Sequence, residues 1–249
     1  KAGADYVKFQ KRDVRVSTPR HMWDTPKETP WGTVEPYIQY RERAEFDKDA
    51  YIKFSTLCDD LGIRWFASAW DKESVDFLDW FSTPYIKIPS ALATNSELVD
   101  YAMTKNAVIV STGMCDNMEL MQIAARIPQN SGHFLFVCHS EYPVTDEREL
   151  NLNQIKRYAR DFPGVGVGFS SHSTSPYPAI YSKFYGAEMV EVHITENRGY
   201  SWGDNPASLE PDGIELIARE FKRIDRIAGD GLKRLYPSEL KARLKLRGI

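Results

Sequence analysis

Seven short apolar segments alternate along the chain with segments of helical pattern, and this alternation constrains the fold more than any other feature. The apolar segments cover residues 6–10, 63–68, 85–90, 107–113, 134–139, 165–171 and 189–195. Helical patterns cover residues 47–61, 71–81, 96–105, 117–126, 152–161, 176–185 and 211–228. Near-continuous apolar strands that alternate with helices indicate a parallel sheet with both faces covered. The sequence therefore predicts an α/β fold.

The number of strands favours one α/β fold over the others. Residues 1–5 have the pattern of a helix end and a turn, so we expect further structure upstream of them. Seven strands with a missing start predict a (β/α)8 TIM-type barrel that lacks strand 1, with the barrel domain over residues 1–230. An open doubly wound sheet is the alternative, and it is weakened because no Gly-rich phosphate turn follows any strand.

Two stretches lie outside this pattern. Residues 11–45 are polar and irregular, with four prolines, and their two tryptophans favour a long loop that is ordered. Residues 231–249 are basic and amphipathic, and they predict a C-terminal helical tail that packs on the barrel or extends from it.

The composition excludes several classes of protein. The chain is 42% hydrophobic and 27% charged with a net charge of -3, which is typical of a soluble globular protein and gives no electrostatic support for a nucleic-acid or membrane-surface partner. No apolar run approaches the roughly 20 residues that a membrane helix needs. The three cysteines, Cys58, Cys115 and Cys138, are far apart and odd in number, which predicts free thiols and a cytoplasmic location.

Polar side chains gather at the ends of the predicted strands. In a parallel barrel the active site lies at the carboxyl ends of the strands, so these side chains are expected to share one rim. They are Lys8, Gln10, Ser68, Lys87, Ser90, Ser111, Thr112, His139, Ser140, Ser170, His172, His193 and Thr195.

Lys8 and Lys87 each lie between apolar neighbours within a strand. The strand period of two places each lysine on the opposite side from its neighbours, and hence inside the barrel. A buried ammonium needs a partner, and these strands offer few carboxylates, so an anionic ligand is expected. Surface lysines or internal ion pairs are the alternative. Lysines beside serine hydroxyls suit a phosphate, or a compound with phosphate and carboxylate groups.

His172 and His193 end two consecutive strands. Their neutral imidazoles could bind one divalent metal, although a strand-end histidine can also serve only as a hydrogen-bonding group. Nearby carboxylates could support the metal or the chemistry, or be surface charges; they are Glu191, Glu196, Asp204 and Glu210.

Several motifs occur in an order that resembles the sialic acid synthase family, N-acetylneuraminate synthase and its relatives. The resemblance runs from residue 1 to about residue 225. The motifs are residues 1–10, Lys87-Ile88-Pro89-Ser90, Ser111-Thr112-Gly113-Met114, Tyr142-Pro143, Gly168-Phe169-Ser170-Ser171-His172 and Ser208-Leu209-Glu210-Pro211. The resemblance implies a barrel transferase that condenses phosphoenolpyruvate with an N-acetylmannosamine-like sugar to a nonulosonic acid and releases phosphate. It also implies a divalent metal, Mn2+ or Mg2+, and a possible homodimer.

The resemblance also assigns roles to individual residues. The metal ligands would be His172 and His193. The catalytic residues would be Gln10, Tyr142 and Asp204, of which Gln10 and Asp204 would contact the sugar. The phosphoenolpyruvate-binding residues would be Lys8, Ser68, Lys87, Ser90, Ser111, Ser140 and Ser170.

The chain departs from the family pattern at several points. Leu92 stands where the family has a glutamate, Ser140 where it usually has an asparagine, and Asn205 falls in its Gly-Pro-Asp-His motif. A first strand with a glutamate, a following Asn-His pair and the antifreeze-like domain are also absent. Leu92 and Asn205 are expected on the sugar side, which suggests a different acceptor sugar or weakened activity.

Two other functions follow from these departures. One is a barrel that binds a sugar or phosphate compound with little or no turnover. The other is a different phosphoenolpyruvate aldol-type synthase, such as a 3-deoxy-sugar-acid phosphate synthase. Its phosphorylated acceptor would need a second basic cluster, for which Arg41, Arg43 and Arg198 are the candidates.

Overall fold

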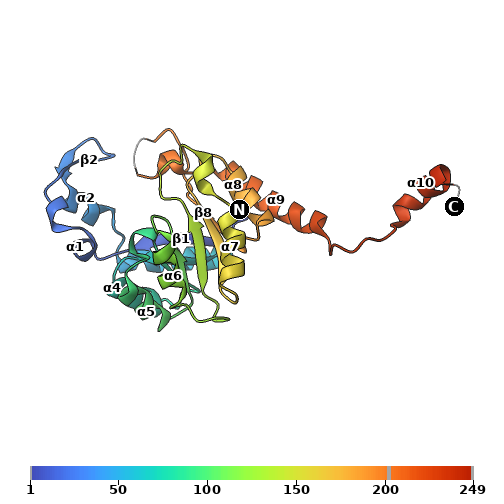
Figure 1. Cartoon of the computed structure of the whole chain (residues 1–249). Helices are drawn as coiled ribbons and strands as arrows, with labels where there is room; N and C mark the ends of the chain where they lie inside the picture. The colour runs from blue at the N-terminus through green and yellow to red at the C-terminus, as the bar shows by residue number, and fades with distance from the viewer. Residues whose placement is uncertain (1, 201–202, 248–249) are drawn as a thin grey trace.

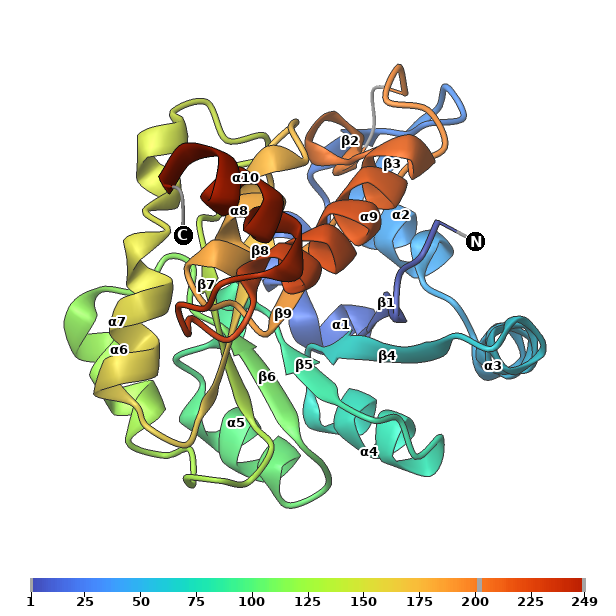
Figure 2. The same cartoon turned by 90° about the vertical axis from the view of Figure 1, so that its right-hand side faces the viewer.

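A seven-stranded parallel sheet forms the centre of the molecule (Figures 1 and 2). The computed structural model describes residues 2–200 and 203–247, so Lys1 and the last two residues of the predicted tail lie outside the described part. The sheet order follows the chain: β1 (Tyr6–Lys11), β4 (Arg64–Ala69), β5 (Ile86–Ile88), β6 (Val108–Ser111), β7 (Phe134–Cys138), β8 (Gly166–Ser171) and β9 (Met189–Val192). The predicted parallel α/β fold and its seven strands are confirmed.

Helices lie along the outside of the sheet, at the positions that the sequence predicts (Figure 2). They are α3 (Lys48–Leu61), α4 (Lys72–Trp80), α5 (Ser96–Met103), α6 (Asn117–Ala124), α7 (Asn153–Asp161), α8 (Tyr177–Phe184) and α9 (Pro211–Ala228). The side chain of Asp71 begins α4 by accepting a 2.7 Å hydrogen bond from the amide of Ser74. Gly62 ends α3 in the left-handed conformation, with a φ of 67°.

The sheet is strongly curled. In a flat sheet with about 4.8 Å between strands, the first and seventh strands would lie about 29 Å apart. Instead, Lys8 Nζ on β1 lies 3.2 Å from Glu191 Oε1 on β9, although these strands stand at opposite edges of the strand order. The seven described strands therefore bend around a common interior, into which one side of every strand faces.

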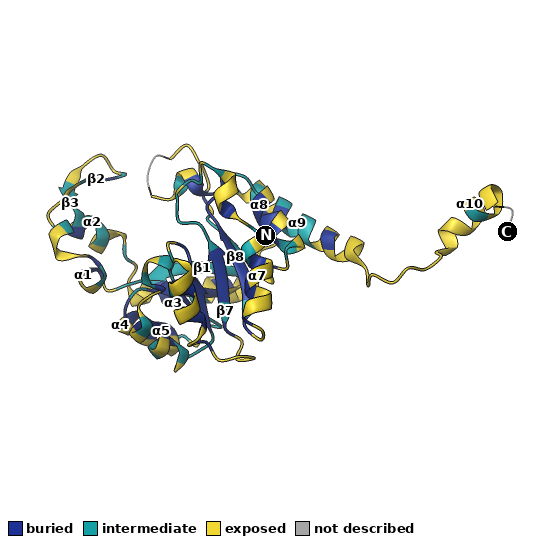
Figure 3. Cartoon of the chain, viewed as in Figure 1, coloured by how far each residue is buried: buried dark blue, intermediate teal, exposed yellow. Residues whose placement is uncertain are grey.

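The side chains of the strands alternate between two cores, and the buried strands stand out in Figure 3. The outward side chains pack against the helices in the larger core, which includes Ala67, Ile86, Ile88, Val110, Leu135, Phe169, Leu78, Val99 and Ile155. The inward side chains of Phe66, Ile109 and Phe136 form a smaller aromatic core inside the curl. The next inward positions along the strands are polar, so this small core is the floor of the site described below.

Two glycines of β8 make room for that floor. Gly166 and Gly168 are the cross-strand partners of Phe134 and Phe136 on β7. A Cβ atom on Gly168 would lie 2.2 Å from the ring of Phe136, and one on Gly166 would lie 2.4 Å from the ring of Phe134. Glycine is therefore needed here because each ring lies across the neighbouring strand.

Residues 11–45 are ordered, but they are less irregular than the sequence predicts. They contain the helix α1 (Val14–Ser17), the turn η1 (Arg20–Met22), the hairpin strands β2 (Pro26–Glu28) and β3 (Val34–Pro36), and the helix α2 (Tyr37–Ala44). The expectation of a plain loop was wrong because the prolines are hairpin and helix-end residues here. Pro26 pairs with Pro36 at the end of a two-stranded ribbon, where a missing amide hydrogen is tolerated, and α2 begins directly after Pro36.

The C-terminal segment extends away from the body of the molecule (Figure 1). Its helix α10 (Pro237–Arg247) contains no buried residue, in agreement with the extending form of the predicted tail. Neither α10 nor any other helix in the described ranges has the length and hydrophobicity needed to cross a membrane.

Candidate active site

The polar side chains at the strand ends surround a single cavity of about 530 Å3. All twelve side chains to which the family resemblance gives a role line it. They are Lys8, Gln10, Ser68, Lys87, Ser90, Ser111, Ser140, Tyr142, Ser170, His172, His193 and Asp204. The curled parallel sheet brings them together because the carboxyl end of each strand opens at the same rim.

A buried ionic cluster lies at the bottom of the cavity. Glu191 Oε1 lies 3.2 Å from Lys8 Nζ and 2.5 Å from Lys87 Nζ. The side chains of Lys87 and Glu191 are only 4% and 11% exposed. Both lysines point inward as predicted, but their protein partner is a carboxylate from β9 that was not assigned to them. Two ammonium groups against one carboxylate leave a net positive charge, which still favours an anionic ligand.

The pKa values of Lys87 and Glu191 keep both of these groups charged near neutral pH. Burial lowers the pKa of Lys87 to about 8, although Glu191 opposes that shift. Burial alone would raise the pKa of Glu191, but the two ammonium groups outweigh it and hold this pKa well below the usual range. Glu191 Oε2 and Ser111 Oγ are buried without a hydrogen-bond partner. Unpartnered buried atoms of this kind are expected where a ligand completes the hydrogen bonding.

Serine hydroxyls surround the lysines. Ser170 Oγ donates to Glu191 Oε1 at 3.2 Å, and Lys8 Nζ donates to Ser68 Oγ at 3.4 Å. The amide of Gly113 donates to Ser90 Oγ at 3.1 Å. A Cβ atom at residue 113 would lie 2.2 Å from the hydroxyl of Ser140, so glycine is what allows the serines after β5 and β7 to converge. This end of the cavity provides hydroxyl and ammonium donors for phosphate or carboxylate oxygens.

The two strand-end histidines lie side by side in the same cavity. The ring centroids of His172 and His193 are 5.2 Å apart, and the ring of Tyr142 stacks on His172 at 3.8 Å. His172 Nδ1 lies 2.6 Å from the carbonyl oxygen of His139 and therefore donates to it, which leaves Nε2 free. Asp204 Oδ2 lies 3.6 Å from His193 Nδ1.

The protonation of these histidines suits a metal. Burial lowers the pKa of His172 to about 4, and burial also lowers the pKa of His193. Both imidazoles are therefore neutral near pH 7, which is the form that coordinates a cation. Two neutral imidazoles, one with its tautomer fixed by a carbonyl, and a carboxylate are ligand types that suit a divalent ion. The ligand atoms of His172, His193 and Asp204 do not all lie within 4.8 Å of one another, so only the ligand chemistry fits here, and a bound ion would have to draw the three groups closer.

Residues 11–45 supply a wall of the cavity that the sequence did not predict. Gln10 Oε1 accepts hydrogen bonds from Arg12 Nη2 at 2.8 Å and from Trp70 Nε1 at 3.1 Å. Arg12 also pairs with Glu45 at 3.2 Å. The further cavity residues from this segment are Lys27, Tyr37, Tyr40, Arg41 and Ala44. The path of this segment over the rim depends on tertiary packing, and no spacing pattern in the sequence reveals it.

Arg41 is the candidate for a second basic cluster that reaches the cavity. Its Nη1 donates to the hydroxyl of Tyr37 at 2.9 Å, and its Nε is buried without a partner. Within the described residues, neither Arg41 nor Lys27 lies within ion-pair distance of a carboxylate. Arg43 instead pairs with Glu35 at 2.8 Å, and the guanidinium of Arg198 donates to a backbone carbonyl outside the cavity.

Leu92 and Asn205, which are expected on the sugar side, do not line this cavity, and Leu92 instead lines a neighbouring pocket together with Tyr37 and Arg41. Leu92 packs against the larger hydrophobic core, and neither residue lines the cavity. Glu196 and Glu210 do not line it either, and Glu210 instead accepts from the amide of Arg198 at 3.0 Å. The departures from the family pattern at residues 92 and 205 are therefore not direct changes to the surface of this cavity.

Comparison with known proteins identifies relatives over almost the whole chain. The model of the NeuB family matches residues 1–233. The chain is 29% identical over 247 residues to human N-acetylneuraminate-9-phosphate synthase. This alignment covers 98% of this chain and 68% of the human protein. It is 34% identical over 226 residues to the Drosophila melanogaster enzyme of the same name, in an alignment that covers 87% of this chain and 59% of the Drosophila protein. It is 27% identical to N,N'-diacetyllegionaminic acid synthase of Legionella pneumophila, with coverage of 99% and 71%.

Solved structures share the fold. The N-acetylneuraminic acid (sialic acid) synthetase of Leptospira borgpetersenii in complex with citrate matches with a TM-score of 0.84 at 24% identity, covering 99% of this chain and 83% of that one. A truncated 3-deoxy-D-arabino-heptulosonate 7-phosphate synthase of Thermotoga maritima matches with a TM-score of 0.62 at 17% identity, covering 74% of each chain. At these identities the structures establish the shared α/β architecture and nothing finer.

Proposed function

Because the chain belongs to the NeuB family of carbon–carbon bond-forming synthases, we propose that it condenses phosphoenolpyruvate with an N-acetylated amino sugar. The products would be a nonulosonic acid and inorganic phosphate. The observation that carries this proposal is the cavity itself, which two ammonium groups, a set of hydroxyls and two neutral imidazoles line together.

The ionic end of the cavity would hold phosphoenolpyruvate. Lys8 and Lys87 would face its phosphate and carboxylate groups, because the pair retains a positive charge after Glu191 is satisfied. The surrounding hydroxyls would donate to the remaining oxygens; they belong to Ser68, Ser90, Ser111, Ser140 and Ser170. An enol phosphate with two anionic groups matches two cations and several hydroxyl donors better than a neutral sugar does.

The chemistry would take place between the two ends of the cavity. C3 of phosphoenolpyruvate would attack the aldehyde carbon of the open-chain sugar, water would add to the cationic C2, and the C–O bond to phosphate would break. Glu191, which is ionised and has an unpartnered oxygen, would stabilise positive charge at C2. Gln10, Tyr142 and Asp204 would orient the sugar.

A divalent metal, Mn2+ or Mg2+, would complete the sugar end. His172 and His193 would hold it, with Asp204 beside them. When bound, it would supply Lewis acidity to the aldehyde oxygen, a contribution of several kcal/mol to such reactions.

The cationic groups from residues 11–45 favour an acceptor that carries its own phosphate. Arg41 and Lys27 line the cavity without a carboxylate partner. The human and Drosophila relatives are named as 9-phosphate synthases, which agrees with an anionic group at the far end of the acceptor. We therefore propose N-acetylmannosamine 6-phosphate ahead of N-acetylmannosamine as the acceptor.

Three further features belong to this proposal. An eighth strand would complete a barrel between β1 and β9, whose inward side chains already meet at 3.2 Å. The enzyme would act as a homodimer, as the family resemblance implies. It would work in the cytoplasm, in agreement with three free cysteines.

The test is an assay of the purified chain with phosphoenolpyruvate, Mn2+ and a panel of N-acetyl hexosamines and their 6-phosphates. We expect phosphate release that requires both substrates, with the nonulosonic acid detected by mass spectrometry. Reactions without sugar provide the control. Binding of phosphoenolpyruvate with no phosphate release for any sugar would support a barrel without turnover instead.

A further inference from the structure

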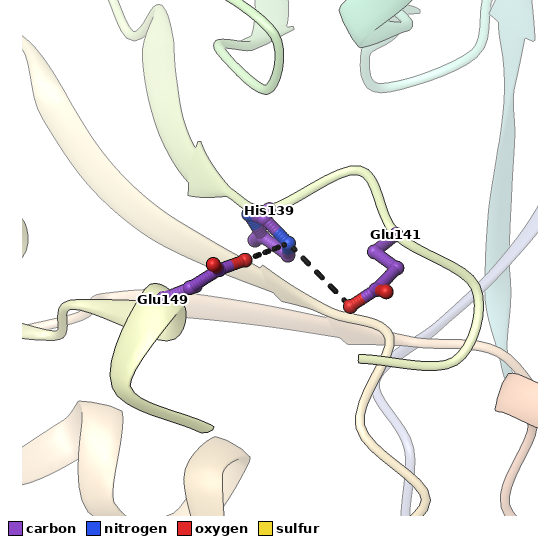
Figure 4. Close-up of side chains that lie close together, drawn as sticks. All are labelled: His139, Glu141 and Glu149. Atoms are coloured by element: carbon purple, nitrogen blue, oxygen red, sulfur yellow. Dashed lines mark ion pairs between the residues drawn. The ribbon is translucent and has the colours of Figure 1, made fainter. Parts of the chain in front are cut away.

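A second group of metal-binding side chains lies in the loop between β7 and α7. It consists of His139, Glu141 and Glu149, here called the loop cluster (Figure 4). One ligand atom from each residue lies within 4.8 Å of the other two. In the described part of the chain it is the one such group of three, and it contains neither His172 nor His193.

The distances in the loop cluster match those of a coordination site. His139 Nε2 lies 3.1 Å from Glu149 Oε2 and 3.8 Å from Glu141 Oε2 (Figure 4). Two ligand atoms that are each about 2.1 Å from a tetrahedral ion lie about 3.4 Å apart. The observed separations fall on either side of that value, so an ion fits between the three groups with small side-chain rotations.

The charges of the loop cluster are not balanced by the protein. In the described ranges, no lysine or arginine lies within ion-pair distance of Glu141 or Glu149. Arg148, which is adjacent to Glu149 in the chain, pairs with Asp146 at 2.6 Å instead. His139 Nε2 is shielded from solvent and makes no hydrogen bond. Two carboxylates and a ring nitrogen that lies within ion-pair distance of both thus converge on one place, where a cation would be bound by all three groups.

The surrounding contacts hold the ligands in place. The carboxylate of Glu141 accepts from the amide of Thr145 at 2.8 Å and from its hydroxyl at 2.9 Å. Hydrogen bonds of this kind orient a ligating carboxylate. Glu149 comes from η3 (Glu147–Leu150), whereas His139 directly follows β7, so an ion would join the two ends of the loop.

We propose that the loop cluster binds one first-row divalent ion, such as Zn2+ or Mn2+, that is separate from an ion on His172 and His193. One imidazole and two carboxylates, with water in the remaining positions, form a donor set that these ions accept. The ion would connect η3 to the end of β7 through its ligands Glu149 and His139. The connected loop carries Ser140 and Tyr142, and the carbonyl of His139 accepts from His172. The ion therefore holds the rim of the active site in place from outside the cavity.

The experiment counts bound metal in the full chain. Chelator-treated protein is dialysed against Zn2+ or Mn2+, and metal per chain is measured by mass spectrometry. The wild type is expected to bind two ions. Glu149→Gln and His139→Ala are each expected to lose one, His172→Ala to lose the other, and His139→Ala with His172→Ala to lose both.

Matched variants distinguish metal binding by the loop cluster from a nonspecific effect of removing a carboxylate from this turn. Glu147→Gln changes an exposed carboxylate of the same turn that is outside the loop cluster, and it should keep both ions. Glu149→Gln is a conservative change at an exposed residue, and circular dichroism checks that each variant is folded. The proposal is overturned if Glu149→Gln and His139→Ala bind as much metal as the wild type with unchanged affinity. Loss of condensation activity is a separate readout, because this count does not depend on the proposed reaction.

Discussion

Lys87 is the residue whose role the structure defines most sharply. It is almost fully buried, and its only anionic protein partner among the described residues, Glu191, is shared with Lys8. Lys87→Met keeps the length of the side chain and removes the charge from the anion end. We expect kcat/KM for phosphoenolpyruvate to fall about 100-fold, because losing one member of a buried charge pair costs about 2–5 kcal/mol. Steady-state kinetics with varied phosphoenolpyruvate measure this. A change confined to the KM of the sugar would contradict the assignment.

The pH dependence of activity tests the same ammonium group. Burial lowers the pKa of Lys87 to about 8, so the group is charged below this pH and loses its proton as the pH rises through it. We expect kcat/KM for phosphoenolpyruvate to be constant near pH 7 and to fall above about pH 8, by up to tenfold for each pH unit. Lys87→Arg is the control, since a guanidinium stays charged and should remove the break. A break that persists in Lys87→Arg would show that another group titrates.

Single residues also show how far the sequence leads. Lys8, Lys87, His172 and His193 could be placed in one site because strand periodicity fixes the side to which each points. Glu191 lies two residues before His193 and shares its face, so the same rule could have assigned it to the lysines. Arg12 and Lys27 could not be assigned, because they reach the cavity only through the tertiary path of residues 11–45.

At the level of the strands, the site rests on the fit between β7 and β8. Gly168→Ala would place a methyl group about where the ring of Phe136 lies, and that ring is 1% exposed and cannot move into solvent. We expect the free energy of unfolding to fall by about 1–3 kcal/mol, as for other overpacked cores. Urea denaturation measures the loss. Phe136→Leu in the Gly168→Ala background should recover part of it, and strictly additive losses would rule out the proposed clash.

Most strands and helices of the fold could be predicted because their signals are local in the sequence. Long apolar strands and capped helices have local signals. Asp71 begins α4 because its carboxylate accepts from a free backbone amide, and Gly62 ends α3 because glycine adopts the left-handed conformation readily. The hairpin of β2 and β3 has strands of three residues each, with prolines at its ends, so it offers no periodic pattern. Local signals did not predict the curling of the sheet either, since curling is a property of all the strands together; only the number of strands favoured a barrel.

For the molecule as a whole, the distribution of charge determines where an anionic substrate binds more than the net charge does. The chain has a net charge of -3, yet the cavity is lined by five cationic and three acidic side chains. The cations come from different elements: Lys8 and Lys87 from β1 and β5, and Lys27 and Arg41 from β2 and α2 in residues 11–45. An otherwise acidic surface with a cationic cavity concentrates anionic substrates at the site. Cationic side chains from both the sheet and residues 11–45 agree with the proposal of two substrates that each carry a phosphate.

Arg41 allows the proposed division to be tested, because it lines the cavity without a carboxylate partner among the described residues. Arg41→Gln removes the charge while keeping a polar side chain beside Tyr37. We expect kcat/KM for N-acetylmannosamine 6-phosphate to fall about 10- to 100-fold, since a hydrogen bond to a charged group contributes about 1.5–3 kcal/mol. The value for unphosphorylated N-acetylmannosamine should change little, so the ratio of the two values is the measurement. Arg15→Gln, an exposed residue of the same segment that pairs with Glu42 outside the cavity, should leave the ratio unchanged. Equal losses for both sugars would mean that Arg41 supports the wall of the cavity rather than a phosphate.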